Sequence, residues 1–341
     1  MRRLIALLIG AIALAACANL TTKDPAAPFH GAIAAPPLPW NSENFDAAPG
    51  KFSFAIITDL NGGERPGVFD VAVAELNLLR PEFIISVGDL IDGVGEDEAS
   101  LTAEWDRFDQ RAAKARAPFF HVGGNHDLTG SALRKIWEDR YGPRYYHFVY
   151  KDVLFLVLDT EDYSLQRMEE IKVIRDTAIK ALAGPHPADA SKLEYFNLPE
   201  RFTGEVGGEQ AAYFEKAILD NPSVRWTFLF MHKPVWRRGG ENAFLRIEAA
   251  LKDRPYTLFN GHVHSYSHTL RQDRDYIIMG TTGGGQDAKD ASAFDHITLV
   301  TIGDGDPSIA SLRLDGVLDK TGAIPEGGDA YCFQASRCGE K

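Results

Sequence analysis

The stretch Phe119-Phe120-His121-Val122-Gly123-Gly124-Asn125-His126-Asp127 runs from an apolar strand directly into an amide, an imidazole and a carboxylate. Four further segments repeat this design, in which an apolar or aromatic run ends on Asp, Asn or His: Asp59-Leu60-Asn61, Gly88-Asp89-Leu90-Ile91-Asp92, Met231-His232-Lys233-Pro234 and Gly261-His262-Val263-His264. Oxygen and imidazole donors gathered in one place bind divalent metals such as Mn, Fe or Zn. Two such ions about 3.5–4 Å apart support phosphoryl transfer, so the five segments predict a two-metal hydrolase.

Predicted strands and helices alternate around these segments. Strands at 52–58, 83–87 and 119–122 alternate with helices at 68–79, 101–115 and 131–140, which indicates an α/β architecture with function at the strand ends. A hairpin with a Lys151-Asp152 turn follows. Further helices are predicted at 168–182, 209–219 and 242–251, and further strands at 224–231, 256–259, 276–279 and 296–301. Residues 184–208 show little periodicity and form either a surface excursion or a lid.

The composition limits the classes of partner. The chain has 341 residues, 45% of them hydrophobic, which is enough for one large domain or two small ones. Its net charge of −12 makes the surface repel nucleic-acid backbones, so no nucleic acid is expected as a partner, and a nuclease is the less favoured reading of a phosphoesterase site. The sequence does not indicate an oligomeric state.

The first residues have the features of an export signal. Arg2 and Arg3 precede an apolar stretch at 4–13 that is too short to span a membrane, and Leu14-Ala15-Ala16-Cys17 resembles a bacterial lipobox. We therefore expect a lipoprotein signal peptide at 1–16 and a lipid on Cys17 that anchors the protein to a membrane surface in the periplasm or cell envelope. An ordinary cleaved signal peptide is the alternative.

Three further regions follow this predicted signal. Residues 17–50 are rich in Ala and Pro and are expected to form an extended tether. The folded domain is expected at 51–318, and a tail at 319–341. Cys332 and Cys338 lie close together in that tail, which in an exported protein predicts a disulfide; a metal-binding pair is the weaker alternative because no histidine lies nearby.

The five segments resemble the calcineurin-like metallophosphoesterase family, whose pattern is D-x-H, G-D-x-x-D, G-N-H-D, a lone histidine after a strand, and G-H-x-H. Four of the five blocks match in full, and the resemblance covers about residues 51–302. It implies a four-layer α/β/β/α sandwich of two mixed sheets flanked by helices. It also implies two divalent ions, Mn, Fe, Zn or Mg, and a small phosphomonoester or phosphodiester substrate.

The resemblance assigns a role to each matching position. Asp89 would bridge the two metals, Asp59 and His264 would hold the first, and the second would be held by Asn125, His232 and His262. His126 would be the general acid, oriented by Asp127 or a nearby carboxylate. A water shared by two cations loses its proton far more easily than bulk water and becomes the attacking hydroxide. Asp92 is assigned no single role, since it could either orient a ligand or cap a turn.

Local geometry adds two expectations. Gly88, Gly124 and Gly261 each precede a proposed ligand, which would allow a sharp turn and a close approach to the metals. His262 and His264 are two residues apart, so on an extended segment their rings would emerge on the same side, with Val263 pointing into the core.

Asn61 departs from the family pattern, which has a histidine at this position. Its amide oxygen is a weaker ligand for transition metals but suits Mn, Mg or Ca. Purple acid phosphatases also lack this histidine but carry a compensating tyrosine, and the corresponding region here reads Leu90-Ile91-Asp92. The first metal is therefore expected to bind loosely. A catalytically weakened metal-binding scaffold is the alternative to an enzyme.

Arginines near two of the segments are candidates for substrate binding. Arg65 follows Asn61 in a glycine-rich loop, and Arg237 follows His232. A guanidinium can bind phosphate through two parallel hydrogen bonds, although a solvated loop arginine is the competing interpretation of each.

Overall fold

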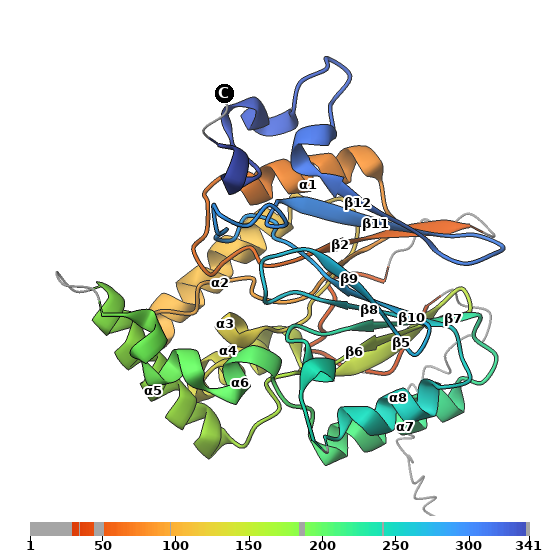
Figure 1. The fold of residues 1–341 in the computed structure, drawn as a ribbon. Coiled ribbons are helices and arrows are strands. Elements are labelled where there is room, and N and C mark those ends of the chain that lie inside the picture. Colours follow the sequence, from red (N-terminus) through yellow and green to blue (C-terminus); the bar gives the residue numbers. More distant parts are fainter. Residues whose placement is uncertain are drawn as a thin grey trace, which may run out of the picture.

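Two β-sheets form the centre of the molecule (Figure 1). The structure is a computed structural model that describes residues 29–33, 35–43, 51–95, 97–183, 188–240 and 242–338. A five-stranded sheet has the order β12-β11-β2-β3-β4, with bounds β2 (Phe52–Ile57), β3 (Ile84–Ser86), β4 (Phe119–Phe120), β11 (His296–Ile302) and β12 (Ser308–Arg313). A seven-stranded sheet has the order β1-β5-β6-β7-β8-β10-β9, with bounds β1 (Phe29–Gly31), β5 (Tyr146–Tyr150), β6 (Val153–Val157), β7 (Trp226–Phe230), β8 (Tyr256–Asn260), β9 (Ser267–Arg271) and β10 (Arg274–Ile278).

Helices cover the outer face of each sheet (Figure 1). The helices α1 (Val68–Leu79), α2 (Glu98–Ala112) and α4 (Ser131–Tyr141) pack on the five-stranded sheet, and α7 (Gly208–Asp220) and α8 (Phe244–Leu251) pack on the seven-stranded sheet. This arrangement confirms the predicted four-layer α/β/β/α sandwich. The remaining helical elements are α3 (Asn125–Leu128), α5 (Leu165–Ala183), α6 (Pro199–Thr203), η1 (Ala190–Lys192), η2 (Glu194–Asn197), η3 (Val235–Arg237), η4 (Leu314–Gly316), η5 (Pro325–Ala330) and η6 (Ala335–Arg337).

The core between the sheets is rich in aromatic residues. Phe54 lies on the side of β2 that faces the other sheet, and its neighbour Ala55 faces the helices, as the two-residue repeat of a strand requires. The Phe148 and Phe155 rings stack 4.6 Å apart, and Phe54 meets Phe155 edge to face at 5.3 Å. This packing holds the two sheets in a fixed relation, which in turn fixes the strand ends relative to one another.

The strands that lead to the predicted site are parallel to their neighbours. In one sheet β2 pairs with β3 and β3 with β4, and in the other β6 pairs with β7 and β7 with β8, all in parallel. Parallel strands place their carboxyl ends at one edge of a sheet. The two sheets therefore bring five chain segments to one place.

Most predicted elements agree with the structure to within a few residues. The helix predicted at 68–79 matches α1 at both ends. The strands β9 and β12 are not predicted from the sequence, because both lie at sheet edges, where their residues are half-buried or exposed and form no apolar run. The described part of the region predicted to be a surface excursion or a lid, residues 188–208, contains η1, η2 and α6.

The predicted tether at 17–50 is wrong for the residues that the structure describes within it, 29–33 and 35–43. The strand β1 pairs with β5, and the Trp40 side chain is 3% exposed and packs edge to face on Phe29 at 5.3 Å. These aromatic residues fill the edge of the core between the sheets, so the fold begins before Lys51. The predicted signal peptide at 1–16, Cys17 and residues 18–28 lie outside the described residues. Within the described residues, no helix is both long and apolar enough to cross a membrane.

The C-terminal segment packs on the five-stranded layer and is not a free tail. A disulfide joins Cys332 to Cys338, and Phe333 is buried in the core next to α1. The main-chain N–H of Asp295 donates a hydrogen bond to the carbonyl of Phe333 at 2.8 Å. The predicted boundary at 318 therefore divides one packed body.

Glu75 gives a prediction about stability. Its side chain is buried in α1 and neither carboxyl oxygen has a hydrogen-bond partner among the described residues. Burial and the charge of Asp315 raise the pKa of Glu75 from 4.5 to about 9. Between these values the unfolded chain ionises while the folded chain stays protonated, so rising pH destabilises the fold. We expect Glu75→Gln to remove this cost, which is roughly 3 kcal/mol at pH 7.

The measurement is the free energy of unfolding by urea as a function of pH. The advantage of Glu75→Gln over the parent chain should be small at pH 4.5 and should grow steadily to pH 8. A difference that does not change with pH would show that Glu75 is ionised in the folded state.

Candidate metal centre

The five predicted segments meet at the carboxyl ends of the parallel strands. Asp59 follows β2, Asp89 follows β3, Asn125 opens α3 after β4, His232 follows β7, and His262 follows β8. All five side chains are buried or nearly so. The structure therefore brings together residues that are up to 203 positions apart, and main-chain N–H of His262 donates to the carboxylate of Asp59 at 3.1 Å.

Two groups of ligand-type atoms share Asp89. The first group is Asp59, Asp89 and His264, and the second is Asp89, His232 and His262; within each group the donor atoms all lie within 4.8 Å of one another. Among the described residues these are the two groups of this kind. A carboxylate common to both is the arrangement that a bridging ligand requires.

The distances around His232 suit a coordination sphere. Its Nε2 lies 3.1 Å from Asp89 Oδ2, 3.2 Å from Asn125 Oδ1 and 3.3 Å from His262 Nδ1. Ligand atoms at about 2.1 Å from one ion are separated by roughly 3.0–3.4 Å in octahedral or tetrahedral geometry. In the other group His264 Nε2 lies 3.2 Å from Asp59 Oδ1, which fits the same pattern. The residues present thus fit a pair of metal ions.

Each imidazole has one nitrogen fixed by a main-chain carbonyl and the other directed at the site. His232 Nδ1 donates to Val87 at 2.9 Å, His264 Nδ1 donates to Gly285 at 2.5 Å, and His262 Nε2 donates to Arg201. This pattern sets the tautomer and the ring orientation of metal-binding histidines. It leaves His232 Nε2, His264 Nε2 and His262 Nδ1 as the ligand atoms.

The charges of the site depend on one another. Burial opposes ionisation of Asp89, but the charges of His232 and His126 lower the pKa of Asp89 well below its usual range. Burial likewise disfavours the charged form of His232, yet Asp89 raises the pKa of His232 to about 9. The buried carboxylate thus attracts positive charge, and bound cations would take the place of the proton on His232.

Glycines allow the close approach that the sequence predicted. A Cβ on Gly124 would lie 2.3 Å from Asp89 Oδ1, and a Cβ on Gly261 would lie 2.2 Å from Asp59 Oδ2. Gly88 has a φ of 99°, and its Cβ would lie 2.6 Å from His232 Nδ1. Any larger residue at these three positions would displace a ligand.

The expectation of an extended His262-Val263-His264 segment is wrong. His262 and His264 have φ angles of 71° and 60°, in the left-handed region. The two turns direct both rings inward, and Val263 is 40% exposed and does not enter the core. The rings reach the site because the backbone folds around it.

Asp127 does not orient His126. Its carboxylate accepts hydrogen bonds from the main-chain N–H groups of Gly124 and Asp89, both at 2.8 Å, and of Leu90 at 2.9 Å. Burial and the charge of Asp89 raise the pKa of Asp127 to about 7. Asp127 therefore fixes the backbone that carries Asp89, and the sequence could not show that its partners are main-chain groups.

The carbonyl of Asp92 orients His126. His126 Nδ1 donates to this carbonyl at 2.6 Å, and Arg175 Nη2 donates to the same oxygen at 3.0 Å. His126 Nε2 lies 3.9 Å from Asp89 Oδ2, at the edge of the metal centre and outside both ligand groups. Burial lowers the pKa of His126. The contribution of Asp92 to the site is its main-chain oxygen.

The two predicted substrate arginines are engaged elsewhere. Arg65 forms an ion pair with Asp295 and donates to the carbonyls of Gly284 and Cys332, both at 3.0 Å. Arg237 lies over the Trp236 ring at 4.8 Å. Arg65 thus ties the C-terminal segment to the loop beside His264, and neither arginine lines the cavity at the metal centre.

A cavity of about 420 Å³ opens over the metal centre. We call it the site cavity; its lining includes Asp89, Asn125, His126, Arg175, Ile179, Tyr195, Phe196, Arg201, His262, Val263 and His264. Sequence reasoning missed Arg175 in α5 and Arg201 in α6. The prediction that residues 184–208 could form a lid pointed to the region of Arg201 but to neither arginine itself. The position of a helix over a site depends on tertiary packing, which the local sequence does not show.

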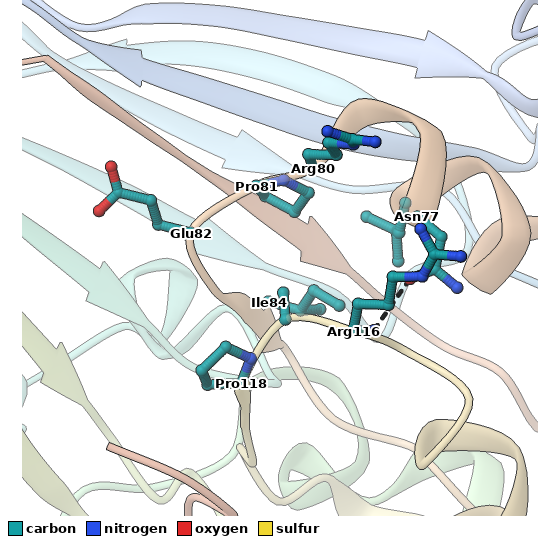
Figure 2. Close-up of a pocket in the computed structure, with 9 residues that line it drawn as sticks. Asn77, Arg80, Pro81, Glu82, Ile84, Arg116 and Pro118 are labelled. Carbon is teal, nitrogen blue, oxygen red and sulfur yellow. Dashed lines mark hydrogen bonds between the residues drawn. The ribbon is translucent and has the colours of Figure 1, made fainter. Parts of the chain in front are cut away.

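A second cavity lies at the opposite end of the strands. It has a volume of about 290 Å³, and its lining includes Arg80, Pro81, Glu82, Arg116 and Pro118 (Figure 2). These residues precede β3 and β4, whereas the metal centre follows them. None of the predicted site residues lines this second cavity.

The fold and the buried His–Asp clusters define a metal-dependent hydrolase with two adjacent metal positions. The sequence model of the calcineurin-like phosphoesterase family matches residues 52–266. The chain belongs to this family, whose members are phosphoester hydrolases that depend on two metal ions. No curated protein has a sequence that matches the chain.

Two solved structures have a similar fold. A dimetal phosphatase from Danio rerio has a TM-score of 0.53 and 13% identity, with 77% of this chain and 96% of that chain covered. A purple acid phosphatase from yellow lupin seeds has a TM-score of 0.52 and 13% identity, with 79% of this chain covered; the match spans 53% of the lupin chain. At this identity the similarity concerns the fold.

Proposed function

We propose that the protein hydrolyses small phosphate esters with two divalent ions held on either side of Asp89. The observation that supports this most strongly is that both ligand groups share the Asp89 carboxylate. The first ion would be held by Asp59, Asn61 and His264, and the second by Asn125, His232 and His262. When bound, the ions would activate a water as the nucleophile and neutralise charge that develops on the phosphoryl oxygens.

His126 supplies the proton in this proposal. Because Nδ1 is bound to the Asp92 carbonyl, Nε2 is the ring nitrogen that can face a leaving oxygen. Asp127 holds the backbone of Asp89 and His126, since it binds the N–H groups on both sides of the metal centre. The chain's own groups thus place the acid beside the bridging carboxylate before any substrate binds.

The test is turnover by purified protein with added Mn, Mg, Zn or Fe on a panel of phosphomonoesters and phosphodiesters. We expect metal-dependent hydrolysis that is lost on chelation and restored by a divalent ion. A chain that binds metal and hydrolyses neither class with any of these ions would instead be the scaffold considered as the alternative.

Asn61 leads to a prediction about the first metal. Asn61 is 1% exposed, and its Nδ2 has no hydrogen-bond partner among the described residues. A neutral amide is a weak ligand, so an isosteric carboxylate should bind a cation more tightly. We expect Asn61→Asp to raise the affinity of the weaker of two Mn²⁺ sites about 10-fold or more. The measurement is calorimetric titration of metal-free protein, and equal affinities in both variants would place Asn61 outside the coordination sphere.

We also propose that the chain is exported and anchored by a lipid on Cys17. The support is the Leu14-Ala15-Ala16-Cys17 sequence together with the disulfide, which persists in oxidising compartments. In a bacterial host, the protein should carry labelled fatty acid and fractionate with membranes. Cys17→Ser should lose both properties if the proposal is correct, and a soluble, unlabelled parent chain would contradict it.

A further inference from the structure

The site cavity has a polar floor and an apolar rim. The floor is formed by the metal centre and His126, whereas the rim includes the apolar side chains of Ile179, Tyr195, Phe196 and Val263, with Asp287 as its one exposed carboxylate. Ile179 is 38% exposed and Val263 is 40% exposed. Exposed apolar side chains around a polar site are typical of a surface that contacts a ligand. A ligand that matches both parts has a charged head and an apolar body.

Arg201 connects the rim to the metal centre. Its carbonyl accepts the hydrogen bond from His262 Nε2, so the main chain of α6 is tied to a proposed ligand. Its guanidinium lies over the rings of Phe196 at 5.0 Å, Phe202 at 5.3 Å and Tyr195 at 5.9 Å. These contacts hold a long side chain in place at the cavity.

The guanidinium of Arg201 has unused donors. Among the described residues the Arg201 side chain makes no hydrogen bond and no ion pair, and Arg201 is one of the residues that line the site cavity. Arg175, the other arginine of the cavity, instead donates to the carbonyls of Asp92 and Gly93. A guanidinium carries five N–H donors and can bind two phosphoryl oxygens at once, so Arg201 is the better placed to bind substrate.

Tyr195 and Phe196 offer a surface suited to a flat ring. Their rings are 5.4 Å apart at an angle of 77°, an edge-to-face pair that keeps both in place. Both line the site cavity, whose volume of about 420 Å³ is within the range of small-molecule sites. Aromatic side chains bind planar rings through stacking as well as area burial, which an aliphatic group cannot match.

Building on the proposed phosphoesterase function, we propose that residues 195–201 recognise phosphate esters whose alcohol carries a flat aromatic ring, such as a nucleobase. Arg201 binds the phosphoryl oxygens, and Phe196 with Tyr195 packs on the ring. The substrate therefore spans the cavity from its polar floor to its apolar rim.

The test compares adenosine 5′-monophosphate with ribose 5-phosphate, which share the phosphate and the primary alcohol and differ in the ring. We expect kcat/KM to favour the nucleotide by roughly 5- to 150-fold, as stacking on one aromatic side chain provides. Phe196→Leu, which keeps an apolar side chain, should reduce this ratio toward one. Leu219→Ala, which trims an exposed residue of α7 that does not line the cavity, should leave the ratio unchanged.

Arg201 is tested separately by its effect on phosphate. Arg201→Gln should lower kcat/KM for both substrates by the same factor, roughly 10- to 100-fold, and raise the inhibition constant of inorganic phosphate similarly. The nucleotide-to-ribose ratio should stay as in the parent chain. Arg107→Gln, on an exposed position of α2, is the matched control. An unchanged phosphate inhibition constant would remove Arg201 from the proposal.

The outcomes separate this inference from the function on which it rests. If the parent chain hydrolyses no phosphate ester with any divalent ion, the proposed function fails. If it hydrolyses ribose 5-phosphate as well as the nucleotide, the function stands and the aromatic preference is wrong. If octyl phosphate is preferred to both, the rim recognises aliphatic chains, and the aromatic assignment is again overturned.

Discussion

Asp89→Asn is expected to lower phosphoester hydrolysis by about 10³-fold or more. Asp89 is the residue shared by both ligand groups, and its Oδ2 lies 3.1 Å from His232 Nε2. An amide has the same shape but no charge, so it cannot offset the repulsion between two cations. The loss should therefore be accompanied by a fall in bound metal from two ions per chain to one or fewer.

The control for Asp89→Asn is Asp139→Asn. Asp139 is an exposed residue of α4 whose carboxylate pairs with Lys135 at 2.7 Å, and it does not line the site cavity. The same chemical change there should alter neither activity nor metal content. An Asp89→Asn variant that retains two ions and full turnover would show that the shared carboxylate is not a bridge.

His126→Ala is expected to lower the rate by about 10²- to 10⁴-fold for substrates with alkyl leaving groups. Alkoxides leave only when protonated, and His126 Nε2 is the group placed to supply that proton. 4-Nitrophenolate leaves as a stable anion, so the loss with 4-nitrophenyl phosphate should be much smaller. The measurement is kcat for both substrate types in the parent chain and the variant.

Metal content separates a lost acid from a lost ligand in the His126→Ala variant. Because His126 lies outside both ligand groups, the variant should still bind two ions. His268→Ala is the matched control, since His268 is exposed and pairs with Asp275 on the hairpin of β9 and β10. An equal loss with both leaving groups would assign His126 to binding or to structure instead of proton transfer.

The positions of the proposed ligands could be predicted from the sequence because each lies just after a predicted strand. Asp59, Asp89 and His232 come at the ends of apolar runs, and parallel pairing places those ends together whatever the loops do. The layers of the α/β/β/α sandwich could also be predicted, because a chain in which strands and helices alternate can pack in only a few architectures.

The orientations of several side chains could not be predicted, because they depend on distant backbone. Asp127 binds N–H groups of the Asp89 loop, and Arg65 pairs with Asp295, 230 residues away. Val263 faces outward because its neighbours adopt left-handed φ angles. Arg201 reaches the cavity through packing of α6, which leaves no local sequence signal. The burial of Trp40 could not be predicted for the same reason, because the neighbouring sequence is rich in proline and alanine.

The most direct test of the account is a crystal structure of the Mn²⁺-loaded protein with anomalous scattering recorded at the manganese edge. We predict two anomalous peaks about 3.5–4 Å apart with Asp89 between them, one beside Asp59 and His264 and the other beside Asn125, His232 and His262. A single peak, or two peaks that do not share Asp89, would contradict the two-metal centre on which the proposed function depends.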